Sequence, residues 1–217
     1  MERPSNPGGE QVEKIWLKSY QKGVPAEIDL SEFQSLGELF EKSVAQYRDR
    51  VAYINMGVEI TYGELDKLSR DFAAYLQSVL KLPQGSRVAV MMPNVLQYPI
   101  SIFGALRAGY VVVNVNPLYT PRELEHQLKD AGAEVIVILE NFAVTLEQVL
   151  DRTPVKHIVI ARLGDMLGFP KGAVVNFVVK YVKKMIPAWS LPRAVNFRTA
   201  IAKGGAGELK AVTVTQD

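Results

Sequence analysis

Four short apolar runs dominate the middle of the chain, and segments with helical spacing of their apolar residues separate them. The runs are RVAVMM, YVVVNV, EVIVIL and HIVIA, at residues 87–92, 110–115, 134–139 and 157–161. Because the runs are apolar on nearly every position, both of their faces are expected to be buried. Strands of this kind that alternate with helices indicate a mostly parallel sheet with helices on both faces. The pattern therefore predicts an α/β fold.

The helices of this pattern have recognisable ends. Those between the apolar runs are predicted at residues 94–109, 121–131 and roughly 142–152. Upstream, Ser35 and Glu38 form a capping box that opens a helix, and Thr61 and Glu64 open a second helix that runs to Leu80. Between these two helices, VAYINMGVEITY predicts a short hairpin across a Met-Gly turn.

The chain divides into four stretches by composition. Residues 1–11 are polar and rich in proline and glycine, which predicts a flexible tail, and residues 12–161 form the α/β subdomain with the parallel sheet. A basic amphipathic segment covers residues 162–203, and a loop is expected at 204–217. The glycine cluster KGGAGELK, residues 203–210, has no predicted strand before it and no dinucleotide spacing, so a mobile loop is expected there.

The corner NVNPLYTPREL lies where the second parallel strand ends. Open α/β sheets bind ligands at the carboxyl ends of their strands, so this corner is a candidate site. Thr120, Pro121 and Glu123 have a sufficient structural role as a helix cap. Asn114 and Asn116 are candidates for the edge of a ligand pocket, and turn stabilisation explains them equally well.

Composition restricts the environment and the partners. The chain has 48% hydrophobic and 22% charged residues and no cysteine, and no apolar run approaches the length of a membrane-spanning helix. A cytoplasmic protein is expected. Residues 162–203 contain eight of the 25 basic residues and one of the 23 acidic residues, a net charge of +7 that leaves −5 for the rest of the chain. This asymmetry favours an anionic partner.

The stretch KGAVVNFVVKYVKKMIPAW, Lys171 to Trp189, predicts a basic amphipathic helix that ends at Pro187. A wide apolar face, a lysine stripe and a nearby tryptophan are typical of a helix that lies on a membrane surface. Packing of the same helix under neighbouring elements explains the pattern equally well. If the helix contacts the membrane, the contact residues are Val175, Phe177, Val178, Lys180, Lys183, Lys184 and Trp189.

Several blocks of sequence occur together in a familiar order. The blocks are ITYGELDKLSRDFAAYL and the continuous stretch from RVAVMMPNVLQ through VNVNPLYTPRELEHQL to DAGAEVIVI. From about Trp16 to Asp217 the chain resembles the beginning of adenylate-forming acyl-CoA ligases. The sequence of VNVNPLYTPRELEHQL is most similar to bacterial long-chain fatty acid–CoA ligases. The resemblance implies activation of a long-chain fatty acid with ATP and Mg²⁺ to an acyl-adenylate, followed by transfer to coenzyme A. Asn114 and Asn116 would then lie at the edge of the acyl pocket.

The motifs that carry this chemistry in the family are not found in the chain. GFPKGA, residues 168–173, superficially resembles the end of the phosphate loop, but no hydroxyl-rich run or strand leads into it. The family's loop is expected beyond residue 217, so the chain is interpreted as an N-terminal fragment that is inactive alone. No catalytic, ATP-binding or metal-binding residue is assigned, and His126 and His157 are interpreted as surface residues.

Other functions and partners follow from the same reasoning. A non-catalytic α/β module that binds lipid or membrane is the main alternative, and a dehydrogenase is disfavoured because no glycine fingerprint follows a strand. A peripheral association with the anionic inner leaflet is expected in the membrane interpretation. No nucleic acid partner is expected. A homo-oligomer is one expected outcome, because a parallel sheet without its neighbours exposes apolar area.

Overall fold

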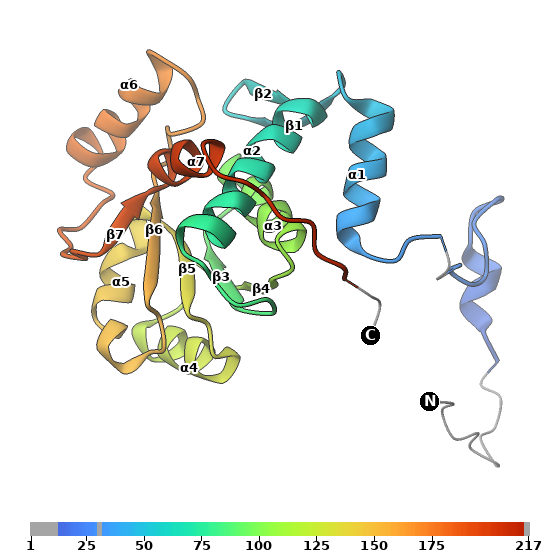
Figure 1. Ribbon diagram of the computed structural model, residues 1–217, viewed down its shortest axis with the longest axis horizontal. Coiled ribbons are helices and arrows are strands. Elements are labelled where there is room, and N and C mark those ends of the chain that lie inside the picture. Colours follow the sequence, from blue (N-terminus) through green and yellow to red (C-terminus); the bar gives the residue numbers. More distant parts are fainter. Residues whose placement is uncertain (1–12, 30–31, 215–217) are drawn as a thin grey trace. The chain divides into compact units, whose positions relative to one another are not determined.

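The computed structural model describes residues 13–29 and 32–214, which form two compact units (Figure 1). In the described residues of the first unit, Met1–Phe33, there is one short 3-10 helix at Ile15–Ser19. The second unit, Gln34–Asp217, contains the sheets and the remaining described helices. Every element discussed below belongs to this second unit.

A five-stranded parallel sheet is the centre of the second unit. Its strands are β3 (Arg87–Met91), β4 (Val111–Asn114), β5 (Val135–Leu139), β6 (His157–Ala161) and β7 (Ala194–Asn196). They lie in the order β4-β3-β5-β6-β7, and each neighbouring pair is parallel. The four predicted strands and their direction are confirmed. The fifth strand, β7, was not predicted, because three residues without a buried apolar run give no periodic signal.

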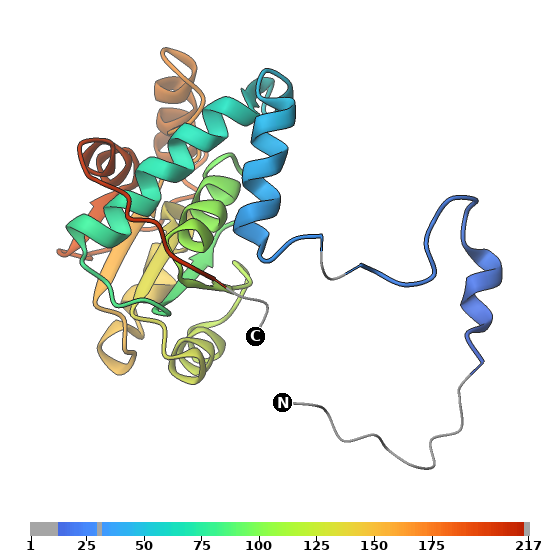
Figure 2. The ribbon, with the colours of Figure 1, turned by 45° about the vertical axis from the view of Figure 1, so that its right-hand side comes forward.

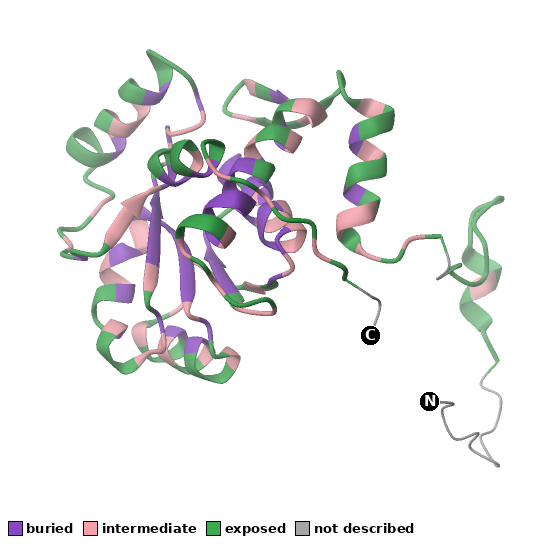
Figure 3. Ribbon diagram, viewed as in Figure 1, coloured by how far each residue is buried: buried purple, intermediate pink, exposed green. Residues whose placement is uncertain are grey.

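Each strand buries side chains on both of its faces. In β3, Val88 and Val90 join one buried cluster, whereas Ala89 and Met91 join a second cluster on the other face. Helices α2 (Tyr62–Ala74), α3 (Gln97–Arg107) and α7 (Phe197–Gly205) contribute to the first cluster, and α4 (Pro121–Ala131) and α5 (Ala143–Glu147) to the second. The buried strands therefore lie between two helical layers, as Figures 1 and 3 show. This confirms the predicted fold class.

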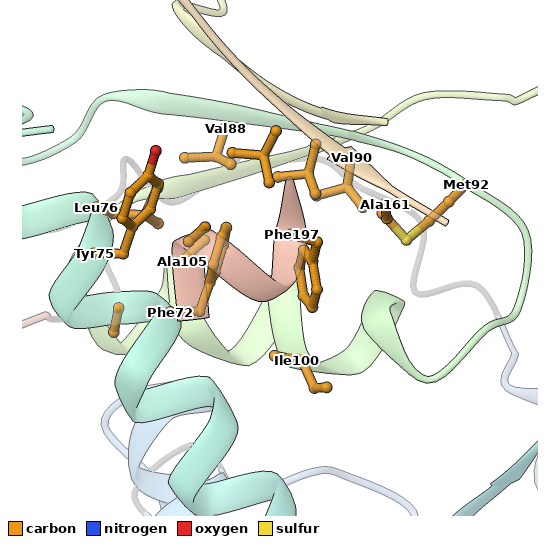
Figure 4. Packing of buried hydrophobic residues seen from close by; sticks show 14 of the residues in the cluster. Phe72, Tyr75, Leu76, Val88, Val90, Met92, Ile100, Ala105, Ala161 and Phe197 are labelled. Atoms are coloured by element: carbon orange, nitrogen blue, oxygen red, sulfur yellow. The ribbon is translucent and has the colours of Figure 1, made fainter. Parts of the chain in front are cut away.

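The first cluster is built from large side chains that meet between α2, α3 and α7. Figure 4 shows Phe72 of α2 and Phe197 of α7 beside Val90 of the sheet. The two phenyl rings lie 5.6 Å apart between centroids, within the range of a favourable aromatic pair. Both side chains are fully buried, so this contact fixes α7 on the sheet although α7 lies far from α2 in sequence.

The predicted hairpin and helix caps are present. β1 (Val51–Asn55) pairs antiparallel with β2 (Val58–Thr61), and Met56 and Gly57 at the turn have φ angles of 49° and 70°. The hairpin follows α1 (Leu36–Tyr47), which Ser35 caps. Thr61 and Thr120 form complete capping boxes with Glu64 and Glu123. The capping box predicted for Ser35 and Glu38 is only half formed, because the Glu38 carboxylate accepts from the Gln34 N–H instead of the Ser35 N–H. Figure 2 shows α1 and the start of α2 beside one another.

The glycine cluster of residues 203–210 begins inside a helix, so the expectation of a loop from residue 203 was wrong. The expectation that no strand precedes the cluster was also wrong. Helix α7 follows parallel strand β7 directly and includes Gly204 and Gly205. A Cβ atom on Gly204 would lie 1.7 Å from the carbonyl oxygen of Asp71 in α2. Only glycine permits this approach of the two backbones, so Gly204 has a packing role. After a turn at Ala206 and a bend at Gly207, the chain has no regular secondary structure as far as Val214.

Two other predicted helices differ in extent. The helix expected at 142–152 is α5, with 3-10 turns at Glu140–Phe142 and Leu150–Arg152 on either side. The amphipathic helix consists of α6 (Lys171–Phe177) and a π-helical turn at Val178–Val182, and it ends before Pro187. Lys184 has a φ of 51°, and the Met185 N–H bonds the carbonyl of Val179, which closes the helix end. In the described part of the chain no helix is long and apolar enough to span a bilayer.

Candidate functional site

The order of the strands makes the carboxyl ends of β3 and β5 a topological switch point. From β3 the chain passes through α3 to β4, which lies on one side of β3 in the sheet. From β4 it passes through α4 to β5, which lies on the other side of β3. Because α3 and α4 cover opposite faces of the sheet, they diverge at this point. Ligands of open α/β sheets bind at such switch points. The described residues at this edge are therefore the first candidates for a functional site.

Two buried polar side chains occupy this edge. Gln97, at the start of α3, is 1% exposed, and its amide donates to the carbonyl of Arg162 at 2.7 Å. Glu140, directly after β5, is 2% exposed. A buried carboxylate is expensive unless it is paired, so its neighbours define the chemistry of the site.

Glu140 lies between two cationic side chains. Its Oε2 is 3.3 Å from Nε of Arg162, which follows β6, and its Oε1 is 3.7 Å from Nζ of Lys180 in the π-helical turn. Oε1 has no hydrogen-bond partner among the described residues, because the lysine contact is longer than a hydrogen bond. This cluster was not predicted from the sequence. Its signal is a single charge directly after the apolar run VIVIL.

The loop after β6 is fixed by a second carboxylate. Asp165 accepts a hydrogen bond from the backbone N–H of Arg162 at 2.8 Å. Burial raises the pKa of Asp165 above its ordinary value, and the bond and charge of Arg162 oppose that rise. The Gly164 N–H donates to Asn176 Oδ1 at 2.8 Å, which joins the loop to α6. The loop and the amphipathic segment are thus one connected layer over this edge.

The two predicted asparagines lie at the end of β4, and both make local hydrogen bonds. Asn114 Oδ1 accepts from the hydroxyl of Tyr98 at 3.0 Å, and its carbonyl accepts from the side chain of Gln127 at 2.9 Å. Asn116 Oδ1 accepts from the N–H of Leu118 at 3.0 Å, which forms an Asx turn. Both residues are exposed. Their role at the edge of an acyl pocket stays a prediction.

Tyr98 connects Asn114 to an apolar hollow. The hollow has a volume of about 410 Å³ and is lined by Tyr53, Ile54, Asn55, Asn94, Val95, Leu96, Tyr98, Pro99, Ile102 and Phe103. Burial raises the pKa of Tyr53, with further contributions from Tyr62 and Tyr98. The predominantly apolar lining with a few polar groups is typical of a site for a small ligand. None of these lining residues was predicted from the sequence.

The predicted membrane-contact residues differ in their surroundings. Phe177, Lys183 and Lys184 are exposed, whereas Val175 and Val178 are half-buried. Trp189 is half-buried and packs against the second apolar cluster. The side chain of Lys180 is 43% exposed, and its ammonium group lies 3.7 Å from Glu140 Oε1. Among the remaining exposed apolar residues of the segment are Val174, Tyr181, Val182 and Met185.

The described residues supply no group of three or more histidine, cysteine or acidic side chains that would hold a metal ion. His126 is exposed on α4, and His157 begins β6, where burial lowers its pKa. Lys171 of the GFPKGA run donates its ammonium to the carbonyl of Met56 in the hairpin turn. Its charge is therefore directed toward the protein itself.

Known proteins resemble this chain both in sequence and in fold. Residues 40–196, which include β1 to β7, match the protein family described as AMP-binding enzyme. The chain belongs to the AMP-binding enzyme family. Within the family, the Escherichia coli O6:H1 protein named long-chain-fatty-acid–CoA ligase is 56% identical over 193 residues, and the Yersinia pestis protein of the same name is 58% identical over 193 residues.

These relatives are longer than the chain. Each match covers 89% of the chain and 34% of the relative, so the chain spans about a third of their length. Among solved structures, an anthranilate CoA ligase in complex with anthranoyl-AMP superposes with a TM-score of 0.68 and 16% identity, covering 87% of the chain and 32% of that protein. At that identity the superposition shows the shared fold alone, which agrees with the parallel sheet and its two helical layers.

Proposed function

We propose that the chain forms part of a long-chain fatty acid–CoA ligase, an AMP-forming enzyme. The observation that carries the proposal is the 56% identity to the Escherichia coli ligase over nearly nine tenths of the chain. In this reaction a fatty carboxylate attacks ATP to give acyl-adenylate and pyrophosphate, and the thiol of coenzyme A then displaces AMP. The substrates are a long-chain fatty acid, ATP with Mg²⁺, and coenzyme A.

The chain's own contribution to this reaction is a scaffold. The parallel sheet holds the carboxyl edge in place, and the hollow beside Tyr98 offers an apolar wall to which Asn114 is bonded. The described residues contain no group of three or more histidine, cysteine or acidic side chains, and no catalytic step is assigned to any of them. We therefore expect the 217-residue chain alone to show no ATP–pyrophosphate exchange with palmitate.

A chimera tests the proposal directly. The 193 matched residues replace their counterpart in the Escherichia coli ligase, and acyl-CoA formation is measured from palmitate, ATP and coenzyme A. We expect activity within about tenfold of the parent enzyme, because the exchanged cores share more than half of their residues. A folded chimera without activity would refute the proposal and support the alternative of a non-catalytic lipid-binding module. The unmodified ligase is the control.

We also propose that the protein is cytoplasmic and associates peripherally with anionic membranes through the amphipathic segment. The support is the exposure of Phe177 together with Lys183 and Lys184, and the absence of any acidic residue between positions 166 and 207. Flotation with anionic vesicles tests this surface. Binding is expected for the unmodified chain and is expected to be lost when Lys180, Lys183 and Lys184 all become glutamate.

A further inference from the structure

The amphipathic segment is held to the sheet by polar contacts on its inner side. Lys180 faces Glu140, the residue that directly follows β5. The side chain of the next residue, Asn141, donates to the carbonyl of Met185 at 3.1 Å. Both contacts connect the same corner of the sheet to the π-helical turn and the residues after it. The orientation of the segment is therefore set by this corner.

The outer side of the same segment is apolar and cationic. Phe177, Tyr181, Val182 and Met185 each expose between 58% and 61% of their surface. Lys183 and Lys184 lie among them and have no ion pair with any described residue. Their charges are not neutralised locally by sequence neighbours either, because the nearest acidic residues are Asp165 and Glu208. Charge and exposure together fit an anionic lipid surface.

We propose that Glu140 is a positioning residue that anchors the segment through Lys180, so that of the three lysines only Lys183 and Lys184 meet the lipid. This assignment rests on the membrane association proposed above. It gives Lys180 a different role from Lys183 and Lys184, although helical spacing places all three lysines in one stripe. The ammonium of Lys180 lies 3.7 Å from Oε1 of Glu140, a buried oxygen that has no hydrogen-bond partner among the described residues. Moving Lys180 toward lipid would remove one of the two cations beside Glu140 and leave only Arg162 to offset the buried charge.

The anchor has a consequence for the exposed apolar residues. The Glu140–Lys180 contact lies in the same π-helical turn as Tyr181 and Val182. A π turn has i→i+5 hydrogen bonds, so the side chains that follow it point in directions other than those of a continuous α-helix. Fixing Lys180 on the inner side therefore keeps these two residues directed outward.

Neutral substitutions separate the two roles. Lys180→Met and Glu140→Gln remove the anchor, and Lys183→Met is the matched control three residues away. Hydrogen exchange of the peptide that covers residues 178–186 is measured in the 217-residue chain, together with binding to vesicles of phosphatidylglycerol. We expect the two anchor variants to raise exchange about tenfold and the control to leave exchange unchanged. The double variant is expected to exchange no faster than either single variant.

Vesicle binding gives the second readout. Lys183→Met and Lys184→Met are each expected to weaken binding about fivefold, whereas Lys180→Met leaves it within twofold. Equal weakening by all three lysine variants would overturn the division of roles. Unchanged exchange in Lys180→Met would overturn the anchor, even if vesicles bind. If the unmodified chain binds no vesicles, the membrane proposal fails and with it the assigned role of Lys183 and Lys184, whereas the exchange result still decides on Glu140.

Discussion

The side-chain amide of Gln77 pairs with the backbone of Lys210 from both sides. Its Nε2 donates to the carbonyl of Lys210 at 3.2 Å, and its Oε1 accepts from the N–H of the same residue at 2.9 Å. Nε2 also donates to the carbonyl of Ala108 at 3.2 Å. Gln77 lies in the π-helical turn that continues α2, and one side chain thus supplies the pairing that a neighbouring strand would give.

We predict that Gln77→Ala releases residues 208–213. The variant loses all three hydrogen bonds, each worth about 1 kcal/mol, and the backbone of these residues has no ladder of its own. The amide of Lys210 is expected to exchange at least tenfold faster in hydrogen-exchange measurements. Gln84→Ala is the control, because its contact with the carbonyl of Thr213 is long at 3.4 Å. Equal exchange in the two variants would show that Gln77 is not the clamp.

We predict that Gly204→Ala severely destabilises the protein. The added Cβ would lie 1.7 Å from the carbonyl oxygen of Asp71, so α7 must move away from α2. The contact between Phe72 and Phe197 would then weaken, and the loss in the free energy of unfolding is expected to be about 3 kcal/mol or more. A Cβ at Gly37 in α1 would meet only Ser35 Oγ, at the ordinary contact distance of 3.6 Å, so Gly37→Ala is expected to be neutral or slightly stabilising. Denaturant unfolding of both variants measures the difference.

The sequence was sufficient for the sheet and its helices because those elements depend on local patterns. Val88, Val90, Ala89 and Met91 are apolar on consecutive positions, and the fold buries them on both faces as this pattern predicts. The caps at Thr61 and Thr120 were likewise predictable, because their partners lie three residues away. In these regions local preference and tertiary packing agree.

The parts that sequence reasoning missed depend on contacts distant in the chain. The anchor at Glu140 needs Arg162 and Lys180, which are 22 and 40 positions away. Strand β7 and helix α7 are fixed by β6 and α2, and nothing periodic marks them beforehand. The lysine stripe was read from helical spacing alone, and spacing does not reveal which lysine meets a buried carboxylate.

We predict a specific pH dependence from Asp165. Burial raises its pKa above the ordinary value of 3.8, so between 3.8 and the raised pKa the folded protein binds more protons than the unfolded chain. The contribution of this carboxyl to the free energy of unfolding therefore decreases as the pH rises through that window. Asp165→Asn keeps an acceptor for the Arg162 N–H and removes the titration.

The measurement is the difference in the free energy of unfolding between Asp165→Asn and the unmodified chain from pH 3.5 to pH 7. The difference is expected to grow in favour of the variant as the pH increases and then to become constant. The variant is compared with the unmodified chain because Glu38, Glu123 and Glu125 have lowered pKa values. These three groups make the free energy of unfolding increase with pH in both proteins, and the comparison removes their contribution. Parallel stability curves for the two proteins would contradict the assignment to Asp165.

We predict that Asn116 acts mainly through its turn. Asn116→Ala removes the acceptor of the Leu118 N–H and is expected to lower the free energy of unfolding by about 1 kcal/mol. Asn116→Asp retains an acceptor at the same position and is expected to stay within about 0.5 kcal/mol of the unmodified protein. Thermal or denaturant unfolding distinguishes them. A loss of stability that is the same in both variants would exclude the Asx turn as the cause.

The role of Asn114 is tested in the active chimera. Its side chain is exposed, so a structural role and a pocket role predict similar changes in the free energy of unfolding, and activity distinguishes the two roles. Tyr98→Phe keeps the ring in the hollow and removes only the hydroxyl that donates to Asn114. If Asn114 forms the edge of the acyl pocket, freeing its side chain raises KM for palmitate several-fold, with the free energy of unfolding changed by less than about 1 kcal/mol. Gln127→Ala is the matched control, since it removes the bond to the Asn114 carbonyl and leaves the side-chain amide in place. An unchanged KM in Tyr98→Phe would show that the contact serves only to join α3 to the end of β4.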